Sequence, residues 1–314
     1  MNKALWRIIP LIALAYLCAY MDRVNVSFAA TQMNVDLGFS ATVYGLGGGL
    51  FFLGYALFEI PSNLMAVRFG PRKWIARIMI TWGLLSAAMV FVSGPISFYV
   101  LRFLLGIAEA GFFPGMILYL TYWFPWAQRG RIVAMFMMAI PLSSVLGAPL
   151  STALLGVSVL GLEGWQTMFL LEGLPAVILG VVVFFRMTDK PAVAKWLSAE
   201  EKATLQRALD RDADVAGPGH LEGLRAALAN PQVWRFAAVY FAVIMGNYGL
   251  GFWLPQIVKG FGGLSNLQTG FLTALPYLLA AIAMVLWGRH ADRTQERVWH
   301  FVLPAGMASL AFLT

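Results

Sequence analysis

Six ionisable side chains lie inside stretches of sequence that are otherwise apolar: Asp22, Arg23, Glu59, Arg102, Glu109 and Glu172. A charge in hydrocarbon costs between about 2.5 and more than 10 kcal/mol, so such groups usually face a bundle interior or a water-filled cavity and serve a function. Carboxyl groups there can exchange protons, and arginines can bind carboxylates through two parallel hydrogen bonds. The chemistry predicted from these residues is therefore ion pairing and proton exchange.

The spacing of four of these residues predicts that they meet. Arg102 and Glu109 are seven residues apart, so on a helix they share one face, about 10 Å apart along the axis. Asp22 and Arg23 are neighbours and point roughly 100° apart. Two acids and two bases from two helices can neutralise one another, which lowers the cost of burying them. If Asp22 and Glu109 take up protons, the arginines become free for an incoming carboxylate, so anion and proton favour each other's binding. A structural salt bridge between the two helices is the alternative.

The elements that carry these residues are predicted to be membrane-spanning helices. The chain is 60% hydrophobic and only 12% charged, whereas a soluble domain has roughly 25% charged residues. Spans need about 20 apolar residues, and nine segments qualify, the last of them cut short by the end of the chain: 8–30, 42–66, 74–93, 96–120, 131–155, 165–186, 232–256, 267–288 and 299–314. The fold class that we predict is an all-α membrane protein.

Several function classes are excluded by what the spans lack. Cys18 is the only cysteine, so no intramolecular disulfide or multi-cysteine metal site is possible. The three histidines lie outside the spans or at their edges, so we expect no metal. A membrane-embedded enzyme or sensor would need a nucleophile–base set or a metal cluster within the spans, and we find neither. We expect no catalytic residues and no cofactor.

The lysines and arginines predict how the chain lies in the membrane. With a cytoplasmic N-terminus, 19 of the 22 basic residues fall in cytoplasmic segments, and only Lys259 falls outside. Basic residues are enriched in cytoplasmic loops, so we place the N-terminus and the 187–231 loop in the cytoplasm. This bias also explains the net charge of +7 without a nucleic-acid partner. The apolar run continues to about Ala30 with no cleavage site, which predicts an uncleaved first span.

The long polar segment predicts a division of the chain into two unequal parts. We expect a six-helix bundle in 1–187, a cytoplasmic linker in 188–230 and part of a second bundle in 231–314. Ser198 and Glu201 form a capping-box pattern, which predicts a short helix in the linker. Because nothing in the linker carries site chemistry, we interpret it as a tether rather than a partner-binding site.

Two basic loops at equivalent places suggest an internal repeat. Residues 63–73 follow the second span and residues 288–298 follow the eighth. Shifted by 225 positions, three pairs of identical residues coincide: Ala66 and Ala291, Arg68 and Arg293, Arg72 and Arg297. A repeat of six spans is the architecture of transporters whose two halves rock about a central site.

Both loops resemble the motif G-x-x-x-D-R-x-G-R-R/K of the major facilitator superfamily. The first copy has Val67 where the motif has Asp, and the motif residues that it keeps are Arg68, Gly70, Arg72 and Lys73. The second copy has Gln295 where the motif has Gly, and it keeps Gly288, Asp292 and Arg293. The resemblance implies that these loops act as a gate that holds cytoplasmic helix ends together. Glu59, near the cytoplasmic face, is interpreted as part of the gate or as a group that pairs at a helix end. Ordinary anchoring by basic loops is the alternative.

Longer stretches are similar to the anion:cation symporter family of that superfamily. They are "RIIPLIALAYLCAYMDRVNVSFA", "YALFEIPSNLMAVRFGPRKWIARIMITWG", "RFLLGIAEAGFFPGMILYLTYWFP", "FLLEGLPAVILG" and "WLPQIVKGFGGLSNLQTGFLTALPYLLAAIAMVLWGRHADRT". Similar bacterial members carry tartrate, sugar acids, phthalate and hydroxyphenylacetate. The resemblance implies a proton-coupled importer of a small organic carboxylate, which we expect to be monomeric.

The resemblance also assigns roles to residues. It implies that Arg23 holds the substrate carboxylate, that Asp22 and Glu109 take protons, and that Arg102 pairs with them or with substrate. Tyr20 and Tyr55 match tyrosines that line the family's cavity, and Asn247 is our candidate from the seventh span. The superfamily has twelve spans, so we expect this chain to be a fragment that cannot complete a transport cycle. An exchanger or uniporter, with structural acids, is the competing function.

Overall fold

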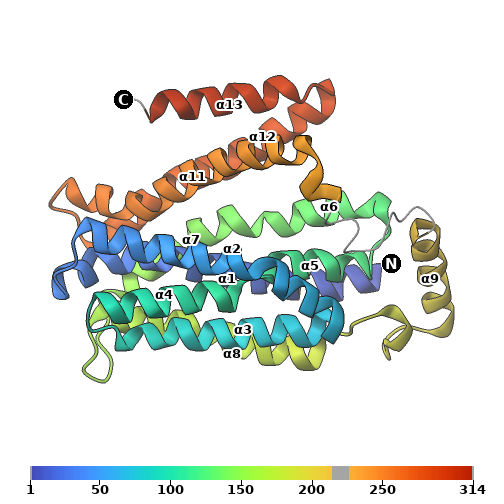
Figure 1. Ribbon diagram of the computed structural model, residues 1–314, viewed down its shortest axis with the longest axis horizontal. Coiled ribbons are helices and arrows are strands. Elements are labelled where there is room, and N and C mark those ends of the chain that lie inside the picture. The colour runs from blue at the N-terminus through green and yellow to red at the C-terminus, as the bar shows by residue number, and fades with distance from the viewer. Residues whose placement is uncertain (1, 214–225, 313–314) are drawn as a thin grey trace.

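The computed structural model describes residues 2–213 and 226–312, which form long α-helices joined by short connections, with no β-strand among these residues. Figure 1 shows most of the helices running side by side along the long axis of the molecule. The α-helices are α1 (Asn2–Asp36), α2 (Ala41–Phe69), α3 (Pro71–Ala87), α4 (Pro95–Glu109), α5 (Phe112–Thr121), α6 (Trp126–Met137), α7 (Ala139–Leu154), α8 (Gly164–Arg186), α9 (Ala199–Ala213), α11 (Pro231–Gly260), α12 (Asn266–Thr294) and α13 (Val298–Ala311). Two 3-10 turns, η1 (Ala88–Phe91) and η2 (Pro191–Val193), complete the described elements.

Eight of the nine predicted spans are helices long and apolar enough to cross a membrane. The predicted all-α membrane fold is therefore confirmed. Some spans consist of two consecutive elements, such as α3 with η1, α4 with α5, and α6 with α7. The ninth predicted span corresponds to α13, a shorter apolar helix.

Helix ends follow local capping chemistry. The Ser40 hydroxyl accepts a hydrogen bond from the backbone N–H of Val43 at the start of α2, and Ser265 and Gln268 form a capping box at the start of α12. These contacts pair backbone N–H groups that have no partner inside the helix. Gly70 ends α2 with φ of +88°, and Pro71 then opens α3. The sharp turn between these two spans thus depends on a glycine followed by a proline.

The fourth span is broken directly after Glu109, where the sequence predicted one continuous helix. Gly111 has φ of +82°, a left-handed conformation that glycine adopts without steric penalty. Pro114 has no N–H to donate to the carbonyl of Ala110, and the Ser62 hydroxyl of α2 donates to that carbonyl instead, at 2.6 Å. Glu109 is consequently the last residue of α4, beside an irregular turn that another helix stabilises.

The fifth span is broken as well, between α6 and α7. Pro141 has no N–H to pair with the carbonyl of Met137, and α6 ends at Met137. The break between the two helices therefore lies about one turn before the proline itself. Pro149 lies inside α7 without ending it.

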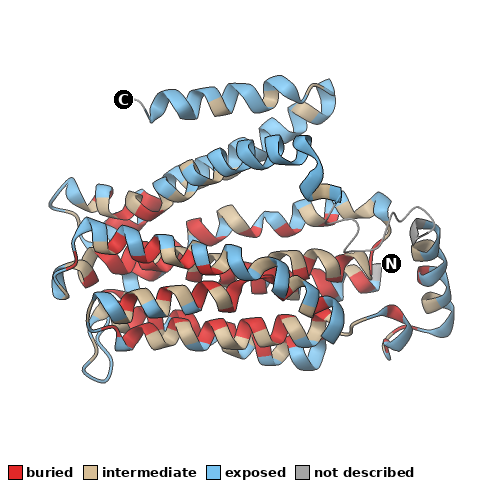
Figure 2. Cartoon of the chain, in the orientation of Figure 1, coloured by how far each residue is buried: buried red, intermediate tan, exposed pale blue. Residues whose placement is uncertain are grey.

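The core lies in the bundle formed by α1 to α8. Figure 2 shows most buried residues in this bundle, whereas α11, α12 and α13 are largely exposed. Trp82, Tyr16, Phe112 and Phe136 form its aromatic centre, with Tyr16 stacked on Phe136 at 4.1 Å between ring centroids. Residues 231–243 at the start of α11 are all exposed. The second group of helices therefore touches the bundle over only part of its length.

The described part of the linker contains helix α9, and the predicted capping box is present. The Ser198 hydroxyl accepts from the Glu201 N–H at 3.1 Å, and Glu201 Oε2 accepts from the Ser198 N–H at 2.9 Å. Lys3 at the start of α1 forms an ion pair with Glu201 at 2.7 Å. The contacts attach α9 to the N-terminal end of α1, and residues 214–225 of the linker lie outside the described structure.

Candidate functional site

Arg23 and Glu109 form an ion pair inside the bundle. Arg23 Nη2 and Nε lie 2.6 and 3.2 Å from Oε2 of Glu109, and the exposed fractions of the two side chains are 12% and 1%. Arg23 Nη1 also donates to the Tyr248 hydroxyl at 3.0 Å. One guanidinium thus joins α1 to α4 and, at the same time, to α11 in the second group of helices.

Asp22 points away from its neighbour Arg23, as the helical spacing predicted. Its Oδ1 accepts hydrogen bonds from the Asn25 amide at 2.9 Å and from the Ser86 hydroxyl of α3. Its Oδ2 is buried and has no hydrogen-bond partner among the described residues. Asp22 is therefore held by neutral donors and not by an arginine.

Arg102 is fully buried, and none of its guanidinium nitrogens has a hydrogen-bond partner among the described residues. Its guanidinium lies over the rings of Phe51 and Phe252, at 4.6 and 6.0 Å from their centroids. Arg102 interacts electrostatically with Glu109 and Asp22 but forms no ion pair with either. The four charges are thus gathered as expected, but they form a single ion pair rather than a closed network, because α4 orients only Glu109 toward Arg23.

Aromatic side chains enclose the Arg23 guanidinium. Its Cζ lies 5.3 Å from the ring centroid of Tyr20, 4.9 Å from that of Tyr55 and 5.8 Å from that of Phe51. Contacts of this kind stabilise a cation that is removed from water. Tyr20 and Tyr55, which the resemblance matches to tyrosines of the family's cavity, therefore lie beside the Arg23 guanidinium.

The residue of α11 that reaches this site is Tyr248, next to the predicted Asn247. Asn247 is exposed, and no hydrogen bond joins it to the charged residues in the part of the chain that the structure describes. The two positions are neighbours on α11, so their side chains point about 100° apart and only that of Tyr248 reaches Arg23. The aromatic character of Tyr248 was the available signal, since three other aromatic rings already surround Arg23.

A further buried acid extends the polar group to α8. Glu172 Oε1 accepts from the Ser151 hydroxyl at 2.6 Å, and the carboxylate interacts with Asn25 and Asp22. Glu172 Oε2 is buried without a hydrogen-bond partner among the described residues. From its place in the middle of a span, Glu172 is expected to be a packing or gate partner. In the structure it lies near Asn25, the residue that also donates to Asp22.

The first basic loop is fastened to the end of α8. The backbone N–H of Arg72 donates to Asp189 Oδ1 at 2.9 Å, and Arg72 Nε lies 3.4 Å from Asp189 Oδ2. A Cβ at Gly70 would lie 3.0 Å from the same carboxylate. Arg68 is exposed and packs on Phe69, at 5.6 Å from the ring centroid. The motif loop therefore joins helices within one bundle.

Glu59 is half-buried on α2, and no ion pair of Glu59 is found in the described residues. It interacts electrostatically with the Arg23 guanidinium but forms no ion pair with it among these residues.

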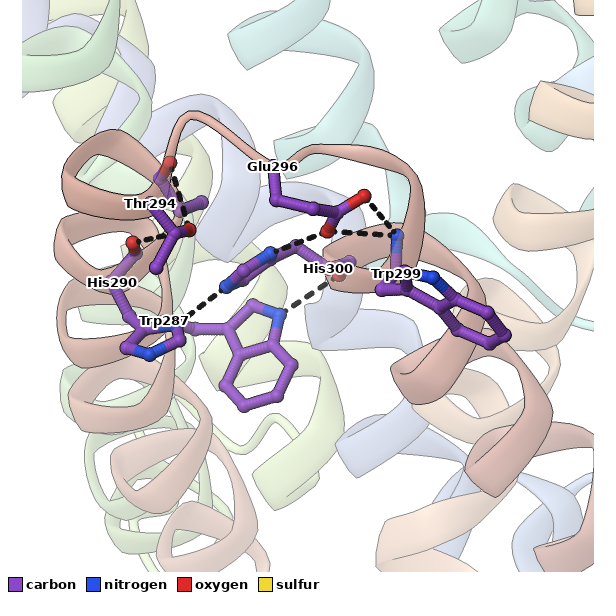
Figure 3. Close-up of polar contacts among 7 residues, drawn as sticks. Trp287, His290, Thr294, Glu296, Trp299 and His300 are labelled. Carbon is purple, nitrogen blue, oxygen red and sulfur yellow. Dashed lines mark hydrogen bonds and ion pairs between the residues drawn. The ribbon is translucent and has the colours of Figure 1, made fainter.

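The second basic loop carries a different polar cluster, shown in Figure 3. His290 Nδ1 lies 2.7 Å from His300 Nε2, and His300 Nδ1 lies 3.1 Å from Glu296 Oε2. Both carboxylate oxygens of Glu296 accept from the Trp299 N–H at 3.0 Å, which caps the start of α13. Asp292 and Arg293, predicted as gate residues, are exposed, and no ion pair of either is found within residues 226–312. The two motif copies therefore differ in their contacts.

The two groups of helices meet at the end of the molecule opposite α9. The Tyr44 hydroxyl donates to the Phe252 carbonyl at 3.0 Å, and the Asn34 amide lies 3.5 Å from the Gln256 side chain. A Cβ at Gly270 of α12 would collide with Thr152 Oγ1 and lie 2.8 Å from the Ala148 carbonyl of α7. At the end of the molecule near α9, helices α11 and α12 lean away from the bundle (Figure 1). The charged group lies at the inner end of this contact, beside Tyr248.

Comparison with known proteins places this arrangement among transporters. Residues 12–314 match the family model described as Major Facilitator Superfamily. A protein of Agrobacterium vitis named "Putative tartrate transporter" is 54% identical over 317 residues, covering 100% of this chain and 73% of that relative. The inner membrane transport protein RhmT of Escherichia coli is 39% identical, covering 93% of this chain and 68% of the relative.

Solved structures share the fold at low sequence identity. A bacterial homologue of the lysosomal transporter Spinster, in an inward-facing and unoccupied conformation, matches with a TM-score of 0.74 and 21% identity, over 93% of this chain and 64% of that one. A D-xylose–proton symporter matches with a TM-score of 0.65 and 15% identity, over 92% of this chain and 69% of that one. These likenesses establish the fold alone.

Proposed function

The chain belongs to the Major Facilitator Superfamily, and from this premise we propose that it carries a small organic carboxylate across the bacterial cytoplasmic membrane together with protons. It is a membrane transporter and not an enzyme. The observation that carries the proposal is the buried Arg23–Glu109 pair, in which a carboxylate already occupies the guanidinium fork.

Proton coupling follows from competition for that fork. A protonated Glu109 no longer offers a negative charge to Arg23, and a substrate carboxylate then forms the charge-assisted hydrogen bonds in its place. A second cation, Arg102, is buried nearby without a hydrogen-bond partner among the described residues, so the site is rich in positive charge once Glu109 is neutral. Asp22, held only by neutral donors, is the second proton-accepting group in this proposal.

The conformational step rests on the contacts between the two groups of helices. Arg23 reaches Tyr248 on α11, so binding of a carboxylate at Arg23 alters a contact that crosses between the halves. With the orientation proposed from the basic residues, the closed end faces outward and α9 faces the cytoplasm. The structure then corresponds to an inward-facing state, and transport requires the halves to rock about this site.

Hydroxylated acids fit the described side chains best. Tyr20, Tyr55 and Tyr248 offer phenolic hydroxyl groups around Arg23, and such groups both donate and accept hydrogen bonds. Two relatives named "Putative tartrate transporter" are 54% and 55% identical to this chain. We therefore place tartrate and similar hydroxy acids first. The same proposal includes a monomeric state and a cytoplasmic linker. It also includes the division of the chain into 1–187, 188–230 and 231–314.

The test is a pH measurement on vesicles that contain the full natural protein in which this sequence occurs. Tartrate is added to de-energised, weakly buffered vesicles, and the external pH is recorded. We expect the medium to become more alkaline as protons enter with the acid. Asp22→Asn or Glu109→Gln should abolish this change, whereas exchange of labelled tartrate for unlabelled tartrate should persist in Glu109→Gln because exchange needs no net proton release.

Two results would contradict the proposal. Entry of labelled tartrate without a pH change would show an exchanger or a uniporter, in which the buried acids are structural. Unchanged proton uptake in both variants would remove Asp22 and Glu109 from the coupling step.

A further inference from the structure

A cavity of about 440 Å³ lies at the end of α1 and α8, far from the Arg23 site. It is lined by the first turns of α1, by Tyr119 of α5, by the last turns of α8 and by Trp196 of the linker. Arg186 is the last residue of the α8 span. The cavity therefore lies where the membrane-spanning part of the bundle ends, on the same side as α9.

Two positive groups and a hydrogen-bond donor are among the residues that line this cavity. Arg7 and Arg186 both line it, and the Arg7 guanidinium lies 5.2 Å from the centroid of the Trp196 ring. Trp196 is itself held in place by stacking on Trp123, with 5.2 Å between ring centroids. Its indole Nε1 is buried and has no acceptor among the described residues. A buried donor without an acceptor is unfavourable, so we expect a ligand atom to accept a hydrogen bond from this nitrogen.

No acidic side chain is among the lining residues that the structure describes. The lining thus carries two guanidinium groups and an indole N–H with no carboxylate of these residues to accept from them, and the complementary ligand is an anion with several acceptor oxygens.

The rest of the lining is apolar. Ile8 and Leu11 contribute from α1, and Val181, Val182 and Phe185 contribute from α8. These residues belong to the spans and continue from the arginines toward the membrane interior. A ligand that fits the whole cavity must combine an anionic head with an apolar body.

We propose that this cavity binds an anionic phospholipid, with the headgroup phosphate at Arg7, Arg186 and Trp196 and an acyl chain along α1 and α8. Basic pockets between spans near the membrane surface bind lipid headgroups in this way. A bound lipid would join the start of α1 to the end of α8 and to the linker, beside the Lys3–Glu201 ion pair. The inference does not depend on the transported substrate.

The test measures lipid binding by the purified full chain in detergent. Native mass spectrometry is used to compare phosphatidylglycerol, which is anionic, with phosphatidylethanolamine, which is zwitterionic. We expect phosphatidylglycerol to bind at least tenfold more tightly, and Arg7→Gln with Arg186→Gln to abolish this preference. Arg131→Gln, which removes an exposed arginine of α6 outside the cavity, is the matched control and should leave it unchanged.

A milder variant guards against misfolding of the double variant. Trp196→Phe keeps a ring that can stack on Trp123 but removes the indole N–H, and it should weaken phosphatidylglycerol binding severalfold with the thermal stability of the lipid-free protein unchanged. Equal binding of both lipids, or full binding by the double variant, would overturn the proposal. Displacement of the lipid by glycerol 3-phosphate at equal concentration would overturn it as well, because it would show a site for a soluble phosphate without a role for the apolar walls.

Discussion

At the scale of single residues, Arg102 is a buried charge that forms no ion pair within the described residues. Its guanidinium is fully buried between aromatic rings, and its nitrogens have no hydrogen-bond partner in the described chain. An uncompensated buried charge destabilises a fold unless it shares its site with an opposite charge. We therefore expect Arg102 to contribute to function rather than to stability.

Replacing Arg102 should separate these two properties. Arg102→Met has a side chain of similar length and keeps the contact with Phe51. We expect the free energy of unfolding to increase by about 1 to 4 kcal/mol, the range observed when buried ionic groups are replaced by well-packed apolar side chains, and substrate transport to be lost. Thermal denaturation in detergent and uptake into vesicles measure the two effects. A fall in thermal stability would show that Arg102 has effective partners in the folded protein.

The sequence located the charged residues of the site but not their pairing. Charges within apolar stretches are visible in any hydropathy pattern, and this signal identified Asp22, Arg23, Arg102 and Glu109. Which acid meets which arginine depends on the rotation and tilt of α1 and α4, and Arg23 pairs with Glu109 while Asp22 is held by Asn25 and a serine of α3. Because these angles are set by packing across the bundle, residue spacing alone could not predict them.

At the scale of helices, α12 and α7 approach closely where the two groups of helices meet, at the end of the molecule opposite α9. Gly270 leaves no room for a Cβ against Thr152 and Ala148. Gly270→Ala should therefore disfavour this closed contact and shift the protein toward the conformation in which these ends separate. Cross-linking of cysteines at positions 34 and 256, in a Cys18→Ala background, should become slower.

Another glycine of the same helix provides the control for this experiment. A Cβ at Gly288 would meet open space, with no atom within 4 Å, so Gly288→Ala should leave the cross-linking rate unchanged. Equal cross-linking in both variants would show that the α12–α7 contact does not determine the state of the outer end.

The attachment of α9 to α1 should depend on pH. The Lys3 ammonium, together with the capping hydrogen bonds at Ser198, holds the pKa of Glu201 below its usual range. A lowered pKa in the folded state adds stability at pH values above the range of an unstructured glutamate, and this stability is lost as the pH falls through the lowered pKa. Hydrogen exchange in α9, corrected for intrinsic rates, should therefore accelerate in acid.

A charge-neutral variant isolates this effect. Glu201→Gln should give fast exchange in α9 already at neutral pH, with little further change in acid. Glu200→Gln, at the neighbouring exposed position, should behave like the unaltered protein. An identical pH profile for Glu201→Gln would show that the ion pair does not attach the helix.

Helix positions followed from apolar segments, but the breaks within spans did not. The residues around Gly111 and Met138 are as apolar as their surroundings, so hydropathy continues across both breaks. The break after Glu109 requires a left-handed glycine and a hydroxyl from another helix at the same time. Such a combination joins residues far apart in sequence and is visible only in three dimensions.

At the scale of the whole molecule, the basic residues predict which end faces the cytoplasm. Single cysteines introduced at Lys195 and Ser158, at opposite ends of the bundle, should react differently with a membrane-impermeant maleimide in a Cys18→Ala background. We expect labelling of Ser158→Cys in intact cells and of Lys195→Cys only after permeabilisation. The reverse pattern would invert the proposed topology and would also place the closed contact at the cytoplasmic end.

The sequence predicted the membrane fold and the resemblance to a transporter family, but not the relative tilt of the two groups of helices. A transporter that alternates between two states has one sequence for both, so the choice depends on small differences in packing energy. Tyr44, Asn34 and Gln256 have no pattern that marks them as contacts between halves. Their pairing at one end became apparent only from the assembled structure.

The hydroxyl of Ser62 predicts which residues occur together at two positions in homologous sequences. It donates to the Ala110 carbonyl that Pro114 leaves without a helical partner, and it accepts from the Trp74 indole at 3.0 Å. A chain that keeps proline at position 114 therefore needs a hydroxyl at position 62, whereas a chain without this proline tolerates alanine there. Across an alignment of the family, these two positions should vary together although they lie far apart in the sequence.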